Sequence, residues 1–314
     1  MKKIFPALLI TIILILFIPY SITIAMNGIK DTESEIIPYD GRIVLVENND
    51  IKMSLDYSVY LVGMTAKMLS AYDTSVFEYP EFIKLCIVLS NTYLAGEFPD
   101  ESVITNDILS DRYLSDDELK YLWKDQYQSY TNAIKLAIQE TGNLIISYDN
   151  SPVSPLYHFI SNGMTRCDAK RPYLKAVSTN EDLEEMGFLC VKQITCEDFL
   201  KTIKKALPDL IISDDYNQLK DNIQIMERDS SGYIKKLKIG SLIMSGDDFM
   251  QIMGINSPSF TITFQENTLK IITKGIGHGY GISMSYALRL AKAGYSYQDI
   301  ISFFYENVEI KNAN

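Results

Sequence analysis

The chain has 314 residues, of which 47% are hydrophobic and 22% charged, and its formal net charge is -11. This composition is typical of a globular chain that buries one large core or two small ones, so it excludes a disordered protein. The acidic balance excludes a nucleic-acid phosphate binder and a protein that adheres strongly to anionic lipid, since both need a basic face.

An apolar segment comes first along the chain. Residues 4–26 are almost entirely apolar and follow Lys2 and Lys3, and at about 1.5 Å per residue a helix of this length crosses a hydrocarbon core of about 30 Å. Because lysines precede the segment and acidic residues such as Asp31 follow it, the N-terminus is expected in the cytoplasm. A cleaved signal peptide is the alternative, although 23–25 (TIA) is a poor cleavage site.

Three regions follow from this pattern. We expect one transmembrane helix as an N-terminal membrane anchor over 1–27, a juxtamembrane linker over 28–40 and an extracytoplasmic domain over 41–314. The protein is then membrane-anchored, with its folded part outside the cytoplasm.

The first half of the domain is predicted to be mostly helical. Apolar spacing predicts a strand over 41–46 and helices over 54–70, 81–94 and 118–142. The last helix should end at Gly142, which supplies a C-terminal cap. The acidic stretch 97–117 is weakly periodic and is predicted to be a surface excursion.

The second half is predicted to be richer in strands. Alternating or β-branched runs predict strands over 143–147, 153–160, 233–243 and 260–272. A short helix is expected over 198–207, and two further short helices close the chain. The predicted fold class is therefore α+β, with mixed helices and antiparallel strands.

The four cysteines do not form a disulfide framework for an exported chain of this size. Cys86 lies on an apolar helix face, which leaves Cys167, Cys190 and Cys196. A disulfide bridge between Cys190 and Cys196 and a set of free thiols stand as alternative predictions.

The sharpest local motif is 275–283 (GIGHGYGIS), in which four glycines alternate around His278. Glycine permits positive φ and lets a backbone approach a ligand closely, and a helix that follows offers free N–H groups. The spacing matches neither a Walker loop nor a dinucleotide fingerprint. A ligand-facing histidine and a packed imidazole in a tight connection therefore stand as equal alternatives.

The second histidine is His158. It precedes Cys167 by nine residues, but two residues do not make a zinc site and no further pair completes one. A structural imidazole is the simpler interpretation, and no metal or cofactor is expected.

Several motifs together resemble one family. The motif 275–283 and its continuation to 301 are similar to the ending G-x-GHG-x-GMSQ-x-GA of the stage II sporulation protein D (SpoIID/LytB) family. Further similar segments are 81–93, 141–148, 157–166, 172–177 and 254–260. The chain resembles this family from about Gly41 to Ile310.

The resemblance implies a fold of the SpoIID type and an activity on cell-wall peptidoglycan. Members are lytic transglycosylases or, in the amidase-enhancer branch, helpers of other wall hydrolases, and they act in sporulation when peptidoglycan around the engulfed forespore is remodelled. A glutamic acid with a raised pKa protonates the glycosidic oxygen and then accepts the proton of the C6 hydroxyl that closes an anhydro ring.

The chain departs from the family at that acid. Aligning the family motif on Tyr60, Gly63 and Ala66 puts Met68 at the glutamate, and methionine cannot donate a proton. Two further polar positions also differ, because Asn91 replaces an arginine and Met284 replaces a glutamine. The nearest carboxylates that could substitute are Asp73, Glu78 and Glu81.

Three functional hypotheses follow. The protein is a catalytically silent glycan binder or scaffold, or it is a transglycosylase with a displaced carboxylate, or it is a structural envelope protein without glycan affinity. The expected partners are peptidoglycan glycan strands and other cell-wall hydrolases, at the cell membrane or the forespore-engulfing membrane. By resemblance, the glycan-binding residues are expected to be His278, Gly277, Gly279, Gly281 and Ser283, with His158 and Ser161 on the facing wall.

Overall fold

The computed structural model describes residues 43–48, 51–99, 103–105, 112–213 and 215–313. It confirms the α+β class, with helices beside small sheets whose strand pairs are mostly antiparallel. The predicted membrane span at 4–26 and the linker at 28–40 lie outside these residues. Within them, no helix is long and apolar enough to cross a membrane.

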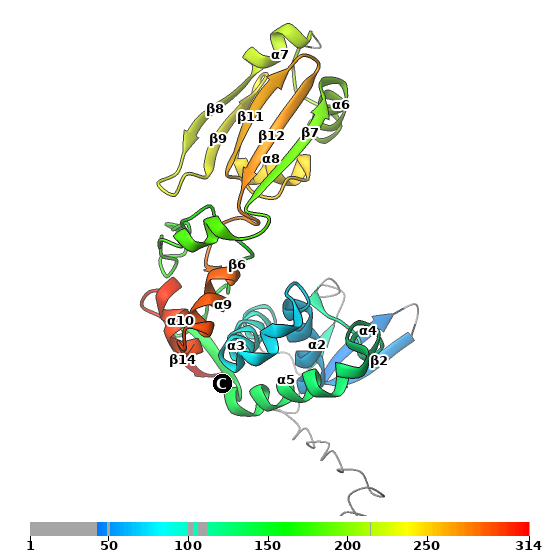
Figure 1. Ribbon diagram of the computed structural model, residues 1–314, viewed down its shortest axis with the longest axis vertical. Helices are drawn as coiled ribbons and strands as arrows, with labels where there is room; N and C mark the ends of the chain where they lie inside the picture. Colours follow the sequence, from blue (N-terminus) through cyan, green and yellow to red (C-terminus); the bar gives the residue numbers. More distant parts are fainter. Residues whose placement is uncertain (1–42, 49–50, 100–102, 106–111, 214, 314) are drawn as a thin grey trace, which may run out of the picture.

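The chain builds two hydrophobic cores. One lies in a helical body, formed by residues 43–174 together with 282–313, and the other in a sheet body, formed by 189–274. Figure 1 shows the sheet body at one end of the long axis and the helical body toward the other, with β6 (Tyr157–His158) on the side of the helical body that faces the sheet body. The sheet body is thus an insertion, because the chain leaves the helical body and later returns to it.

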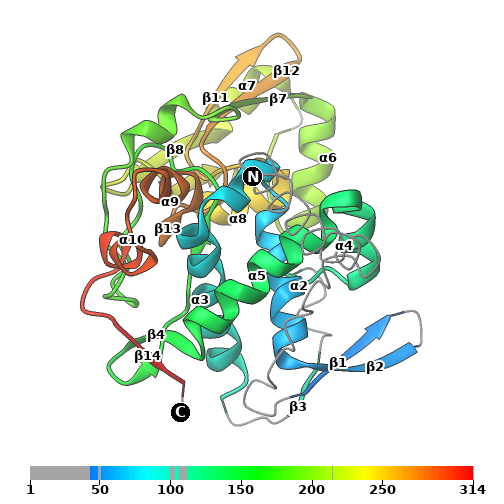
Figure 2. The ribbon, with the colours of Figure 1, turned by 60° about the horizontal axis from the view of Figure 1, so that its bottom comes forward.

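Helix α3 (Pro80–Glu97) is the centre of the helical body. Pro80 occupies its first turn, where a missing N–H costs nothing, and apolar residues cover nearly all of its faces. Helices α2 (Tyr57–Leu69), α5 (Tyr127–Thr141) and α10 (Tyr297–Phe304) pack on it, as seen in Figure 2. This arrangement fixes α2 and α3 side by side.

The other elements of the helical body surround this centre. They are β1 (Ile43–Asn48), β2 (Ile51–Asp56), η1 (Thr74–Glu78), β3 (Val103–Thr105), α4 (Asp116–Trp123), η4 (Lys124–Gln126), β4 (Leu144–Tyr148), β5 (Ser151–Pro152), β13 (Ile282–Ser283), α9 (Met284–Lys292) and β14 (Glu309–Asn312). Strand β13 pairs in parallel with β6 (Tyr157–His158), and β14 pairs with β4.

The sheet body holds two three-stranded antiparallel sheets, in the orders β10-β9-β8 and β11-β12-β7. Its strands are β7 (Leu189–Thr195), β8 (Ile223–Arg228), β9 (Ile234–Ile239), β10 (Leu242–Met244), β11 (Phe260–Gln265) and β12 (Thr268–Lys274). Its helices are α6 (Cys196–Ala206), α7 (Tyr216–Asn222) and α8 (Gly246–Met253). The 3₁₀ turn η5 (Asn180–Glu184) lies just before β7.

The structure changes four predicted elements. The helix expected over 118–142 is broken where Lys124 has a φ of 46°, although it does end at Gly142. The strands expected over 233–243 and 260–272 are each a hairpin, which turns at Gly240 in the first and at Glu266 in the second. The strand expected over 153–160 shrinks to β6, because only two of its residues pair with β13.

The cysteines in the described part of the chain are all free thiols. Cys190 lies in β7 and Cys196 begins α6, so the bridge considered between them is not formed. Cys86 is buried in α3, as its apolar surroundings predicted, and this burial raises the pKa of its thiol.

Candidate functional site

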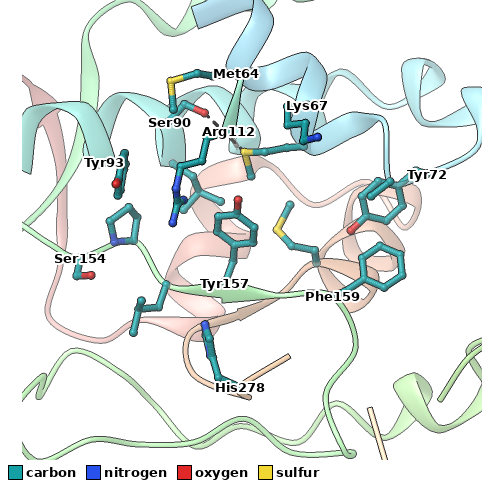
Figure 3. A pocket seen from close by; sticks show the side chains of 16 residues that line it. Met64, Lys67, Tyr72, Ser90, Tyr93, Arg112, Ser154, Tyr157, Phe159 and His278 are labelled. Atoms are coloured by element: carbon teal, nitrogen blue, oxygen red, sulfur yellow. Dashed lines mark hydrogen bonds between the residues drawn. The ribbon is translucent and has the colours of Figure 1, made fainter. Parts of the chain in front are cut away.

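A pocket of about 540 Å³ opens between the two central helices and the connection to the sheet body. It is lined by residues of α2 and α3, by Arg112, by the 154–159 segment and by His278 and Met284. Figure 3 shows Met64 and Ser90 on one side, Tyr157 near the middle and His278 on the opposite side. Met68 and His278, which are 210 residues apart in the sequence, therefore share one pocket.

Met68 lies on the pocket wall with its side chain half-buried. The Ser90 hydroxyl donates a hydrogen bond to the Met68 thioether, with Oγ and Sδ 3.6 Å apart. No aspartate or glutamate among the described residues lines this pocket. The described wall thus offers hydroxyl groups and two cationic side chains, but no carboxylic acid.

The three substitute carboxylates lie elsewhere. Asp73 accepts a hydrogen bond from the Ser75 amide at 2.9 Å, and its bonds with Ser75 lower its pKa. Glu81 pairs with Lys84 and accepts the amide of Tyr297, which holds the start of α10. Glu78 is exposed and also does not line the pocket.

Asn91 and Met284, at the other two altered motif positions, differ in their surroundings. Asn91 is buried behind the pocket, where it accepts a hydrogen bond from the Tyr57 hydroxyl at 3.1 Å. Met284 lines the pocket itself. The pocket wall therefore carries the thioethers of Met68 and Met284, which the sequence comparison aligned with polar residues of the family motif.

The glycines of the 275–283 motif pack against the chain itself. Their φ values are positive, and a Cβ on Gly277 would lie 2.7 Å from the His158 Cβ. A Cβ on Gly279 would lie 2.3 Å from the Tyr233 ring, and one on Gly281 would lie 1.9 Å from the Leu156 carbonyl. The close approach expected toward a ligand is therefore made toward neighbouring segments of the protein.

Gly281→Ala is expected to lower the free energy of unfolding by about 2–3 kcal/mol, because it adds a backbone clash to an unfavourable φ. Gly142→Ala is the matched control: Gly142 also has positive φ, but no atom would lie within 4 Å of its Cβ. The control carries only the backbone strain of a positive φ, so it should lose less, on the order of 1 kcal/mol. Urea unfolding measures both, and equal losses would refute the packing argument.

Two hydrogen bonds define the states of the two histidine rings. His158 is buried and its Nδ1 donates to the Tyr280 carbonyl, 3.1 Å away, so its Nε2 carries a lone pair. The Tyr280 amide donates to His278 Nδ1 at 3.0 Å, which places the proton of a neutral His278 ring on Nε2. The ring centroids lie 6.0 Å apart.

Burial keeps both rings neutral. It lowers the pKa of His158 to about 3, with a further contribution from the nearby His278. Burial also lowers the pKa of His278 to about 4; Asp247 opposes this shift and Arg166 adds to it. His278 therefore presents a neutral imidazole to the pocket at physiological pH.

These shifts predict a stability that depends on pH. In the unfolded chain each imidazole takes up a proton as the pH falls below about 6.5, whereas in the folded chain both stay neutral to much lower pH. The free energy of unfolding is therefore undiminished above pH 6.5 and decreases as the pH is lowered from there. His158 alone should contribute a loss of roughly 2 kcal/mol by pH 5. Urea unfolding at pH 7 and pH 5 measures this, and His158→Leu should flatten the slope. A ring NMR resonance titrating near pH 6.5 would contradict the prediction.

Ser161 and Ser283 are buried behind the pocket rather than lining it. The Asp182 carboxylate accepts hydrogen bonds from Ser283 Oγ at 2.6 Å, from Ser285 Oγ at 2.5 Å and from the Ser161 amide at 2.9 Å. The Ser161 hydroxyl is hydrogen-bonded to the Thr179 hydroxyl. Asp182 was not foreseen, because in the sequence it is one acidic residue within a charged stretch.

Arg166 anchors the glycine-rich motif to the sheet body. Its Nε donates to Asp229 at 2.7 Å and its Nη1 lies 3.0 Å from Asp247. Nη1 also donates to the His278 carbonyl, and the guanidinium stacks on Tyr280 at 4.1 Å. The position of His278 thus depends on contacts from both bodies.

No group of three or more potential metal ligands is found among the described residues. His158 is buried and Cys167 is exposed, so the pair considered for zinc does not share an environment.

No protein-family model matches the chain. Stage II sporulation protein D of Bacillus subtilis (strain 168) is 24% identical over 269 residues, which cover 81% of this chain and 74% of that protein. The protein of the same name from Bacillus amyloliquefaciens has the same identity and coverage. An uncharacterized protein of Brachyspira hyodysenteriae is 31% identical over 98 residues, 30% of this chain and 27% of that protein. The chain is a distant homologue of stage II sporulation protein D.

Proposed function

We propose that this protein acts on the cell wall during sporulation as a catalytically silent relative of stage II sporulation protein D that binds peptidoglycan glycan strands. The distant homology supports the cell-wall role. The main support for a catalytically silent protein is the position of Met68 on the wall of a pocket whose described lining holds no carboxylate. A general acid contributes about 10²–10⁴-fold to such a reaction, and a thioether cannot replace it.

The geometry of the pocket supports glycan binding. Aromatic rings of Tyr72, Tyr93, Tyr157 and Phe159 line it, and such rings can pack against the faces of sugars. His278 offers a hydrogen-bond donor at Nε2. We infer that His158, Ser161 and Ser283 support the wall that carries His278, since all three are buried. Bound in this way, a strand could be presented to a partner hydrolase.

The same proposal includes the membrane topology. The anchor over 1–27 would hold the folded part, outside the cytoplasm, close to the wall that it binds. The alternative of a displaced acid has less support, because Asp73 and Glu81 are engaged in helix-end contacts and Glu78 lies outside the pocket.

Incubation of the full chain with purified sacculi tests the proposal. We expect co-sedimentation without release of anhydro-muropeptides. Release of those products would show an active enzyme. If the protein neither binds sacculi nor releases these products, the result would indicate a structural envelope protein.

His278→Ala is expected to weaken sacculus binding about tenfold, because it removes a donor and a ring surface from the pocket. The melting curve should be nearly unchanged, since the imidazole is only partly buried. Tyr295→Ala, which removes a half-exposed ring outside the pocket, is the control and should bind as the unmodified protein does. A large loss of stability in His278→Ala would instead support a packed imidazole.

A further inference from the structure

Two cations line the pocket although the chain as a whole is strongly acidic. Lys67 and Arg112 are exposed at its rim, and neither forms an ion pair with a described residue. Lys84 and Arg166, in contrast, each contact two carboxylates. The pocket is thus a local excess of positive charge in a chain whose formal charge is -11.

Arg112 is held in a geometry suited to recognition. Its guanidinium lies over the Tyr93 ring, 4.4 Å from the centroid, and Figure 3 shows it directed between Tyr93 and Tyr157. Stacking uses the face of the planar group and leaves its N–H edges free to donate. A guanidinium edge matches a carboxylate, with which it forms two parallel hydrogen bonds.

Lys67 adds a second positive charge beside Met68. Glu118 is close enough for Lys67 to contribute to the lowered pKa of its carboxyl group, but that carboxylate is hydrogen-bonded to Ser115, forms no direct ion pair with Lys67 and does not line the pocket. His278 contributes no charge, since its ring is neutral. With Met68 where the family has an acid, the described pocket wall contains no anion to balance these two cations.

We propose that the pocket recognises a carboxylate on the glycan, held by Arg112 and supported by Lys67. This rests on the proposed function and names the chemistry of its ligand: a carboxylate-bearing strand and not a neutral one. Peptidoglycan offers that group in two places, on the lactyl ether of muramic acid and on the stem peptides. The same cations could bind either one.

Binding of three ligands to the detergent-solubilised full chain tests the inference. They are glycan strands freed of stem peptides, the same strands with peptides, and neutral N-acetylglucosamine tetramer. We expect the unmodified protein to bind a carboxylate-bearing strand about tenfold more tightly than the tetramer, with an affinity that falls as salt rises. The better of the two strands identifies the source of the carboxylate.

Arg112→Gln should remove most of that tenfold preference, because it weakens binding of the carboxylate-bearing strand much more than binding of the neutral tetramer. Lys67→Gln should lower the preference for the carboxylate-bearing strand by a smaller factor, because a flexible ammonium group makes no bidentate contact. Lys238→Gln, which removes an exposed lysine from β9, is the control and should have no effect.

The outcomes separate the two proposals. If the unmodified protein binds sacculi but prefers no carboxylate, or if Arg112→Gln retains the full preference, carboxylate recognition is wrong and glycan binding stands. If it binds neither sacculi nor any of the three ligands, the proposed function fails and the inference fails with it.

Discussion

Met68→Glu is expected to raise glycan cleavage by the protein well above that of the unmodified chain. The side chain at this position is half-buried on the wall of the pocket, so a carboxyl group there would face the bound strand. General-acid catalysis contributes about 10²–10⁴-fold, and we expect at least about 100-fold more anhydro-muropeptide from purified sacculi than the unmodified protein releases. Chromatography of the soluble products measures it.

The pH dependence of this variant has a defined sign. Lys67 and Arg112 at the same pocket favour the ionised carboxylate, whereas the acid must be protonated to act. The rate should therefore fall as pH rises from 5 to 8. Met68→Gln has a similar shape but donates no such proton, so it should stay inactive. If the unmodified protein released as much product as Met68→Glu, another carboxylate would be the acid and the silent reading would be wrong.

Arg166→Ala is expected to lower the free energy of unfolding by about 3–5 kcal/mol. The Arg166 side chain is only 5% exposed and neutralises the carboxylates of Asp229 and Asp247, which are themselves largely covered. Removal of the cation leaves two carboxylates close together without a partner, and breaking a buried pair in this way typically costs that amount. Urea unfolding, followed by circular dichroism, measures the loss.

Two further variants serve as comparisons for Arg166→Ala. Arg166→Lys keeps the charge but cannot reproduce both carboxylate contacts, so it should recover only part of the stability. Glu227→Gln removes an exposed pair with Lys235 and Lys236, and its unfolding midpoint should not change measurably. Equal midpoints for Arg166→Ala and Glu227→Gln would show that the buried contacts contribute nothing.

Arg166→Ala should also weaken sacculus binding, because Arg166 donates to the His278 carbonyl at 3.0 Å. A glycan-binding loss that exceeds the fraction unfolded would link the sheet body to the pocket wall.

Elements with a strong local signal could be predicted from the sequence. The apolar spacing of 81–94 matched α3, and the glycine at 142 marked the end of α5. Elements that end at a turn without glycine or proline were harder to predict from the sequence. The break at Lys124 was missed because a lysine with positive φ has no sequence signature. The edge strands β7 and β14 were also missed, since their pairing partners are distant in the chain.

The candidate site divides in the same way. The motif around His278 was visible because four glycines alternate within a few residues, and the alignment led to Met68. Arg112 lies in a stretch that was interpreted as a surface excursion, so nothing local marked it as part of a pocket. The glycines were interpreted as facing a ligand, whereas their missing side chains make room for Leu156, His158 and Tyr233.

The sequence by itself determined the α+β class and the central helix, and it led to Met68 as the residue aligned with the family's acid, because periodicity and residue chemistry are local properties. Only the tertiary structure decided which side chains meet: it placed Met68 and His278 in one pocket, buried Ser283 against Asp182, and left Arg112 without a described carboxylate partner. The physical reason is that burial and charge pairing depend on residues far apart in the sequence, such as Arg166 and Asp229, and their distances are fixed only when both cores have formed.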